Sequence, residues 1–417
     1  MKDAQKIGIS TGEEMRPILI PLGRLLSMAR ESRDTKMTGS QVGPHSIAWC
    51  ISTAGSLLIV NSAVCADHRP SQAVRDANAC PRGELRMPSI PGGRPLGPPG
   101  VPSITVSSTV AASDSSTSTV IRPDPKDQIT CRRTSLKSIS GVIFSKPRLS
   151  NGKTADLQMD VQIPIPSKKR PLVVYVTGGG FVIAAKEAAL DLRTYVAEAG
   201  FVVASVQYRT LSDGANFHDS IEDIKSAIRY LRANADNFDV DPDRVAVWGE
   251  SAGGYLASMV GLTNGYKSFD AGTNLNQSSA VQAVVDKFGP SDATKVAADF
   301  DTQSKASYAS PTNPISLYMG ADAATAANPL TYVGASKPPF LIFHGTQDRL
   351  VSPTQTLILH NALNAAGSRS IRYVLEGAGH GDMAFMGDSE SGLPWSAKET
   401  MGIIVEFLRA SIGGDRT

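Results

Sequence analysis

Cysteine is scarce in this chain of 417 residues, and its placement narrows the chemistry that the chain can perform. The four cysteines are Cys50, Cys65, Cys80 and Cys131, so residues 132–417 contain none. That segment therefore has neither a thiolate nucleophile nor a cysteine-based zinc site. Cys80 and Cys131 allow one disulfide if the chain folds in an oxidising compartment, and otherwise they are two unrelated thiols.

A strong charge of either sign is also missing. Lys and Arg number 41 against 39 Asp and Glu, which gives a formal net charge of +2, and neither sign forms a long run. This balance excludes the basic footprint of a protein that binds a nucleic-acid backbone. The sequence has no H-E-x-x-H zinc motif, and NGKT at 151–154 has Pro147 where a Walker loop requires its first glycine. We therefore expect no metal, no cofactor and no nucleic-acid partner.

Residues 37–66 contain no Lys, Arg, Asp or Glu and have the features of an export signal. Basic residues precede the apolar run IAWCISTAGSLLIV at 47–60, and small residues end the segment before Asp67. We predict that residues 1–66 are an N-terminal tail with an export signal, which makes the chain periplasmic or secreted. The alternative is an uncleaved membrane anchor, because about 18 uncharged residues approach the length that spans a bilayer.

The composition changes twice after this segment. Residues 67–130 are rich in Pro, Gly, Ser and Thr, which bury too little apolar surface to offset their ordering entropy, so we predict a flexible linker there. We assign residues 131–417 to one catalytic domain. Its apolar, strand-like runs lie at 171–176, 201–208, 244–249, 281–289, 339–345 and 371–377. Helical patterns lie near 186–199, 217–234, 252–262, 354–367 and 396–411. This alternation predicts an α/β fold with a mostly parallel central sheet and helices on both faces.

One serine follows a predicted strand and precedes a predicted helix among residues with small side chains. The stretch GESAG, residues 249–253, fits the G-x-S-x-G pattern with Ser251 at its centre. The glycines on either side allow a turn tight enough to expose the serine hydroxyl. At the start of the helix, the Ala252 N–H is available to a developing oxyanion. We interpret Ser251 as a candidate nucleophile.

A serine nucleophile needs a base and an orienting carboxylate. His380 lies in the glycine-rich stretch EGAGHGD, at the end of the predicted strand 371–377. Asp348 lies in the stretch FHGTQD, at the end of the predicted strand 339–345. The order Ser251, Asp348, His380 is the chain order of the triad in α/β-hydrolases. Two alternatives stay open: Asp292 in GPSD could orient the imidazole instead, and His380 could be an ordinary loop histidine.

These motifs together resemble the α/β-hydrolase esterase and lipase group that carries an HGGG motif, over residues 134–414. Residues 217–257, from FHDSIEDI to GESAGGYLA, are similar to its carbohydrate- and feruloyl-esterase-like branch and to its hormone-sensitive-lipase-like branch. The resemblance implies the α/β-hydrolase fold without a large lid. It also implies that Thr177 stands where the family usually has the histidine of HGGG.

The resemblance assigns a role to each site residue. It implies Ser251 as nucleophile, His380 as base and then acid, and Asp348 as the residue that orients His380. The remaining implied residues are the oxyanion donors Gly179, Gly180 and Ala252.

We therefore expect a serine carboxylic-ester hydrolase that acts on short-chain acyl or carbohydrate-borne esters. Residues 289–335 are expected to line its substrate pocket, or equally to pack their aromatic rings in the core; these rings belong to Phe300, Tyr308, Tyr318 and Tyr332. The alternatives are an amide hydrolase with the same triad and a non-catalytic α/β-hydrolase that binds a ligand. The partner expected is a small-molecule or carbohydrate ester, and the oligomeric state stays open.

Overall fold

The computed structural model describes residues 49–51, 57–59, 79–81, 107–109, 115–381 and 390–413. The chain divides into two compact units, Met1–Ser71 and Gln72–Thr417. In the first unit, β1 (Trp49–Ile51) and β2 (Leu57–Ile59) form an antiparallel pair. Both strands lie within the predicted export signal, whose cleavage or anchoring stays a prediction. Within the described ranges, no helix is both long and apolar enough to cross a membrane.

The second unit is built around a nine-stranded sheet with the strand order β3-β11-β10-β9-β8-β6-β7-β5-β4. Of these strands, β5 runs antiparallel to both of its neighbours and the other pairings are parallel. The strands are β3 (Thr119–Ile121), β4 (Leu136–Ser145), β5 (Leu157–Pro164), β6 (Arg170–Val176), β7 (Val202–Val206), β8 (Val240–Glu250), β9 (Ala283–Lys287), β10 (Phe340–Gly345) and β11 (Ser370–Leu375). The predicted α/β fold class with a mostly parallel sheet is confirmed.

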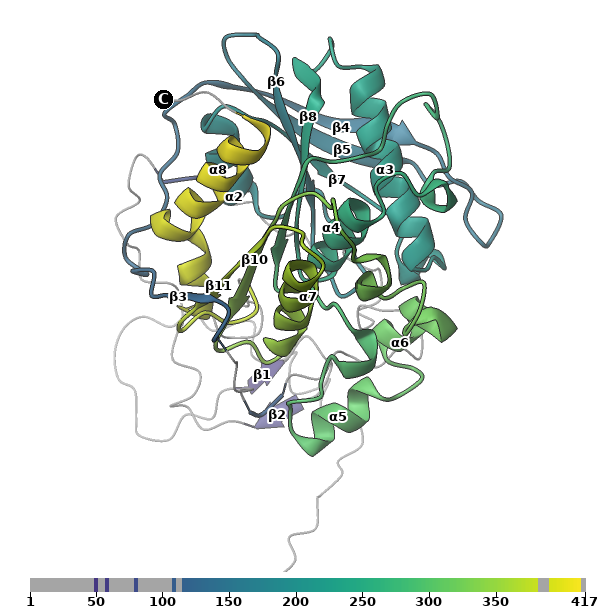
Figure 1. Cartoon of the computed structure of the whole chain (residues 1–417), viewed down its shortest axis with the longest axis vertical. Coiled ribbons are helices and arrows are strands. Elements are labelled where there is room, and N and C mark those ends of the chain that lie inside the picture. The colour runs from purple at the N-terminus through teal and green to yellow at the C-terminus, as the bar shows by residue number, and fades with distance from the viewer. Residues whose placement is uncertain are drawn as a thin grey trace, which may run out of the picture. The chain divides into compact units, whose positions relative to one another are not determined.

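Helices cover both faces of the sheet because its central strands are apolar on both sides (Figure 1). Along β6, Leu172 and Val174 enter one core cluster, whereas Val173 and Tyr175 enter the other. The helices α3 (Phe217–Ala233), α4 (Ala252–Leu262) and α7 (Thr354–Ala365) bury residues in the first cluster. The helices α2 (Leu190–Glu198) and α8 (Lys398–Ile412) bury residues in the second.

The helix α3 shows why the sequence pattern located these elements well. Its apolar residues recur every three or four positions, and Ile221, Ile224 and Ile228 are fully buried. Asn216 caps its first turn, because the Asn216 side chain accepts the N–H groups of His218 and Asp219. Periodicity and a capping residue therefore fix this helix before any long-range contact is considered.

The second unit extends further toward the N-terminus than the predicted domain boundary at residue 131. Strand β3 lies inside the predicted linker, yet it pairs in parallel with β11 at the edge of the sheet. Cys80 forms a disulfide with Cys131, with the two Cα atoms 4.7 Å apart. Ser107 is buried and its N–H donates to the carbonyl of Arg349. Part of the Pro- and Ser-rich segment is thus held against the hydrolase fold, and the rest of residues 67–130 lies outside the described residues.

Short helices connect β9 to β10 and form the wall of a pocket described below. They are η3 (Ala293–Lys295), α5 (Thr302–Tyr308), α6 (Pro314–Met319), η4 (Gly320–Asp322) and η5 (Pro329–Tyr332). The remaining short helices are η1 (Leu211–Asp213), η2 (Lys267–Phe269) and η7 (Glu390–Ser396).

Candidate active site

Ser251 occupies the single residue between β8 and α4, in a backbone conformation that few non-glycine residues adopt. Its φ is 54° and its ψ is −122°. The turn leaves no space for side chains beside it: a Cβ on Gly249 would lie 2.0 Å from the Gly253 carbonyl oxygen. A Cβ on Gly253 would lie 2.1 Å from the carbonyl oxygen of Val176. The small residues around Ser251 therefore serve a strained turn that exposes its hydroxyl.

The structure brings the three predicted triad residues together at hydrogen-bond distance. His380, after β11, has its Nε2 2.7 Å from Ser251 Oγ. The Nδ1 of His380 lies 2.7 Å from Oδ2 of Asp348, which follows β10. With Nδ1–H donating to the carboxylate, Nε2 is free to accept the serine proton. The catalytic roles stay a prediction, but the geometry is that of a nucleophile, a base and an orienting acid.

Asp348 lies in a fully buried socket that keeps its carboxylate charged. Oδ1 accepts the N–H groups of Leu350 and Val351, both at 2.9 Å. Oδ2 accepts from His380 and also lies 3.1 Å from Nε2 of His344. Burial alone would raise the pKa of Asp348, but the charge of His380 and the hydrogen bonds of both imidazoles hold this pKa well below its usual range.

His344 is a site residue that sequence reasoning missed. It lies in β10 one residue before the strand ends, it is fully buried, and burial lowers the pKa of its imidazole. Its Nδ1 lies 2.9 Å from Thr356 Oγ1 and its Nε2 lies 2.9 Å from the Val351 carbonyl oxygen. The Val351 carbonyl accepts from Nε2–H, which also faces Asp348, and burial disfavours a second proton on this ring. The spacing of four residues between His344 and Asp348 was the available signal.

Asp292, the alternative acid, is occupied elsewhere. Its Oδ1 accepts from the N–H and the hydroxyl of Thr294, and its Oδ2 lies 2.8 Å from Lys295 Nζ. It caps the short helix η3 rather than contacting His380. The geometry therefore selects Asp348 as the partner of His380.

Of the predicted oxyanion donors, Ala252 follows the nucleophile directly, and Gly179 and Gly180 follow Gly178, which approaches it closely. Ala252 is the first residue of α4, so its N–H has no acceptor within the helix. A Cβ on Gly178 would lie 3.2 Å from Ser251 Cβ, which places the glycine loop directly against the serine. Gly179 has φ 147°, and a Cβ there would lie 2.1 Å from the Ile183 carbonyl oxygen. The close approach of Gly178 was not foreseen, and the donor roles of Gly179, Gly180 and Ala252 stay predictions.

Thr177 stands where the HGGG motif has its histidine, at the start of the glycine loop. Its main-chain carbonyl fixes this part of the loop to Tyr208. Thr177 is buried, and its carbonyl oxygen accepts the hydroxyl of Tyr208 at 2.9 Å. Its own hydroxyl donates to the Gly178 carbonyl at 3.1 Å. A neutral side chain therefore fills the position, and its hydroxyl bonds to the backbone of the glycine loop itself.

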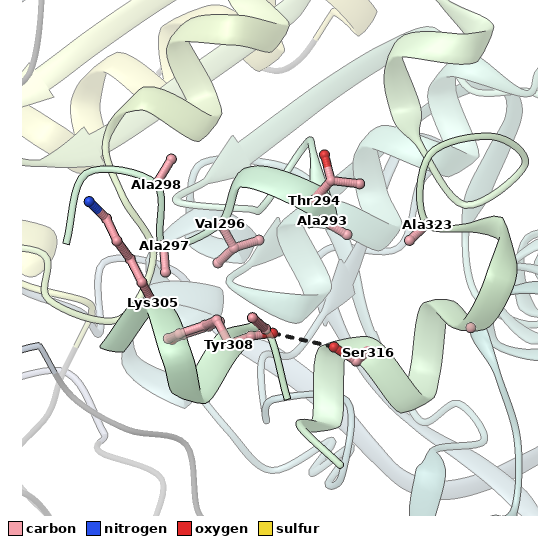
Figure 2. A pocket seen from close by; sticks show the side chains of 11 residues that line it. Ala293, Thr294, Val296, Ala297, Ala298, Lys305, Tyr308, Ser316 and Ala323 are labelled. Atoms are coloured by element: carbon pink, nitrogen blue, oxygen red, sulfur yellow. Dashed lines mark hydrogen bonds between the residues drawn. The ribbon is translucent and has the colours of Figure 1, made fainter. Parts of the chain in front are cut away.

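A pocket of about 330 Å³ lies among the short helices between β9 and β10 (Figure 2). Its walls are mostly small and apolar, with Val296 and several alanines, and Lys305 and Tyr308 add polar groups. The Tyr308 hydroxyl donates to the Leu350 carbonyl, two residues after Asp348. Ser251, Asp348 and His380 are not among the residues that line this pocket.

The four aromatic residues expected either to line the substrate pocket or to pack in the core divide between the wall of the pocket among the short helices, which no triad residue lines, and the core. Tyr308 lines the pocket, and Phe300 packs beside it in a small buried cluster. Tyr318 is fully buried and stacks on Phe181 with ring centroids 4.3 Å apart. Tyr332 packs edge-on against other rings. For Tyr318 and Tyr332 the core alternative therefore describes the structure.

Comparisons with known proteins place these features in context. The sequence profile of the family described as BD-FAE matches residues 159–363. Esterase LipC of Mycobacterium tuberculosis is 30% identical over 223 residues, which are 52% of this chain and 54% of that protein. The probable isoprenylcysteine alpha-carbonyl methylesterase ICMEL1 of Arabidopsis thaliana is 25% identical over 264 residues, which are 61% and 55% of the two chains. The chain spans about half the length of the curated relatives it matches.

Solved structures share the fold. A truncated carbohydrate esterase from gut microbiota has a TM-score of 0.53 at 24% identity, over 67% of this chain and 96% of that one. A bifunctional GH43-CE protein of Bacteroides eggerthii has a TM-score of 0.56 at 27% identity, over 66% of this chain and 35% of that one.

Proposed function

We propose that this chain, which has the fold of the α/β-hydrolase esterases and matches the BD-FAE family model over residues 159–363, is a serine carboxylic-ester hydrolase. The observation that carries the proposal is the continuous hydrogen-bonded chain Ser251–His380–Asp348, with both links at 2.7 Å. The names of the relatives, which include esterases and a methylesterase, support the same reaction class.

The proposed mechanism follows from the proton positions. Ser251 Oγ attacks the ester carbonyl while His380 Nε2 takes its proton, and Asp348 stabilises the imidazolium that forms. The oxyanion receives hydrogen bonds from the N–H groups of Ala252 and the glycine loop. His380 then protonates the departing alcohol, and a water activated by the same imidazole releases the acid from the acyl-enzyme.

The substrate class that we propose is a short-chain acyl ester or an ester carried on a carbohydrate. The segment between β9 and β10 contains only short helices, which supports an active site without a large lid. One solved structure with the same fold is named a carbohydrate esterase and another a bifunctional GH43-CE protein, and these names support the carbohydrate alternative.

We also propose that the protein is exported. The uncharged stretch at 37–66 supports this location, and so does the Cys80–Cys131 disulfide, because such bonds persist in oxidising compartments. Expression of the full chain in a bacterial host, followed by fractionation and N-terminal sequencing, tests the proposal. A mature N-terminus near Asp67 supports cleavage, a membrane-bound full-length chain supports an anchor, and a chain that stays intact in the cytoplasm contradicts export.

The activity is tested with p-nitrophenyl esters from acetate to palmitate. We expect the wild-type chain to prefer the short esters, and Ser251→Ala or His380→Ala to lower kcat by about 10⁴-fold or more. A fluorophosphonate probe should label the wild-type protein and leave folded Ser251→Ala unlabelled. A folded wild type that hydrolyses anilides but no ester indicates the amide hydrolase. A folded wild type that turns over neither and takes no label indicates a ligand-binding protein.

A further inference from the structure

A buried lysine lies directly behind the nucleophile. Lys287 ends β9, after Asp286 in the same strand, and its side chain is only 1% exposed. The Nζ atom is 2.6 Å from Oε1 of Glu250, the residue that precedes Ser251. A buried ion pair gains little stability over apolar side chains of the same volume, because both charges lose their hydration. A lysine at this position therefore calls for an explanation other than packing.

Three aromatic rings enclose the ammonium group of Lys287. The Nζ atom lies 4.9 Å from the ring centroid of Trp395, 5.7 Å from that of Phe288 and 6.0 Å from that of Trp248. Each of these distances is within the range of a cation–π attraction, which strengthens when the cation is shielded from water. The ammonium is thus the centre of a cluster of three rings and one carboxylate, which we call the Lys287 cage.

The Lys287 cage touches both halves of the proposed catalytic machinery. On one side, the N–H of Ser251 donates to the carbonyl of Lys287 at 2.9 Å. On the other side, Trp395 donates its indole N–H to the carbonyl of Gly379 at 3.0 Å, one residue before His380. The Phe288 ring lies 4.6 Å from the His380 imidazole and 4.8 Å from the Trp395 ring.

We propose that Lys287 is a positioning residue for the proposed esterase reaction. Its ammonium fixes the Trp395 indole, the indole holds the Gly379 carbonyl, and this keeps His380 Nε2 in line with Ser251 Oγ. Lys287 itself touches neither the substrate nor the reacting atoms. The inference rests on the proposed function, because a reactive Ser251–His380 pair is what the cage positions.

The first test is Lys287→Met, which keeps the length of the side chain and removes its charge. We expect kcat for p-nitrophenyl acetate to fall roughly 10- to 100-fold with KM changed by less than about threefold, since small displacements of catalytic groups cost rates of this order. The matched control is Lys225→Met. Lys225 is also fully buried, donates to the Thr263 carbonyl at 2.7 Å and lies over the Phe269 ring, away from the triad. Lys225→Met is expected to lower the melting temperature and leave kcat unchanged.

Two further variants separate positioning from charge balance. In Glu250→Gln/Lys287→Met no unpaired charge remains, so a kcat that stays low supports positioning, whereas recovery of the wild-type kcat overturns it. Trp395→Phe keeps a ring but removes the N–H donor to Gly379, and it should lower kcat without raising KM. This variant decides the proposal if Lys287→Met does not fold.

A double-mutant cycle provides the final criterion. If Lys287 acts through Trp395, the combined variant Lys287→Met/Trp395→Phe loses less than the product of the two single losses. Multiplicative losses overturn the proposal, and so does a Lys287→Met enzyme as active as the wild type. In the latter case the proposed function survives, whereas an inactive wild type overturns both.

Discussion

Two buried aspartates at neighbouring strands of the same sheet carry their charge differently. Asp286 lies in β9, and Asp348 follows β10. The strands β9 and β10 pair in parallel. Both side chains are almost completely shielded from water. Burial raises the pKa of Asp286 to about 6, and the hydrogen bonds from Ser258 and Gly289 offset only part of this rise. Burial acts on Asp348 in the same direction, yet the pKa of Asp348 ends well below its usual range.

The difference shows that partners, not burial, decide in which direction the pKa of each carboxyl group moves. Asp286 accepts from a hydroxyl and a backbone N–H, which are neutral donors. Asp348 faces two imidazoles and two backbone N–H groups, and one of these imidazoles gains a proton in the proposed reaction. A triad acid has to be an anion to stabilise that imidazolium, whereas a carboxylate that only ties a strand to a helix has no such requirement.

Removing the charge of Asp348 should have the largest effect, because only this one of the two aspartates contacts His380. Asp348→Asn keeps the shape but favours the wrong tautomer of His380, so kcat for p-nitrophenyl acetate should fall about 10⁴-fold. The control is Asp292→Asn, because Asp292 bonds to Thr294 and Lys295 instead of to His380. Steady-state kinetics on both variants, with melting curves to verify folding, provide the measurement. A loss below tenfold in Asp348→Asn, or an equal loss in Asp292→Asn, would contradict the assignment.

Local signals in the sequence were enough to locate the main elements. The pattern near 252–262 became α4 (Ala252–Leu262), and the apolar run at 171–176 became most of β6 (Arg170–Val176). The triad residues were also predictable, because the G-x-S-x-G turn and two loops after strands are each visible within a few residues. In a parallel sheet, the carboxyl ends of strands meet at one edge, which brings such loops together.

What the sequence did not reveal are contacts between distant segments. The run around Val120 looks like part of a polar linker, and it becomes a strand only because β11 offers it a free edge. Lys287 looks like an ordinary charge at the end of a strand, since its cage requires Trp395 from a segment more than one hundred residues later. Periodicity reports which face of an element is apolar, but not which polar groups another element brings to it.

The imidazole of His344, which also contacts the Asp348 carboxylate, allows a smaller change to the partners of Asp348 to be tested. His344→Phe removes one donor to Oδ2 and leaves the Val351 carbonyl without its partner. We expect kcat to fall roughly tenfold, which corresponds to the lower end of the value of a hydrogen bond to a charged group. His344→Gln keeps a donor and should lose less activity, and an equal loss in the two variants would indicate a packing defect instead.

The charge of Asp348 also predicts how the stability of the folded chain changes with pH. The lowered pKa of Asp348 contributes stability that is present above the pKa of the unfolded chain, about 3.9, and is lost as the pH falls toward the folded pKa. In His344→Phe the folded pKa of Asp348 is lowered less, so the variant loses less stability between pH 7 and pH 3 than the wild type, and its decline ends at a higher pH. Urea unfolding between pH 3 and pH 7, on the order of one measurement per pH unit, tests this shift. Identical curves for the two proteins would show that His344 does not help to hold the charge.

Asp286 should give the opposite result, with stability changing and activity unaffected. Asp286→Asn preserves the acceptor for the Gly289 N–H and can donate to Ser258 Oγ, so the connection between β9 and α4 is retained.

The wild-type chain binds a proton more tightly when folded, so its stability falls as the pH rises from about 4 to about 6, and the asparagine variant lacks this loss. At pH 7.5 the variant should be more stable by up to about 3 kcal/mol, with the advantage disappearing near pH 4. Urea unfolding at the two pH values measures the difference, and p-nitrophenyl acetate hydrolysis should be unchanged. If the variant is less stable at both pH values, the ionised form of Asp286 stabilises the fold. Asp286 would then resemble Asp348 in being required as an anion.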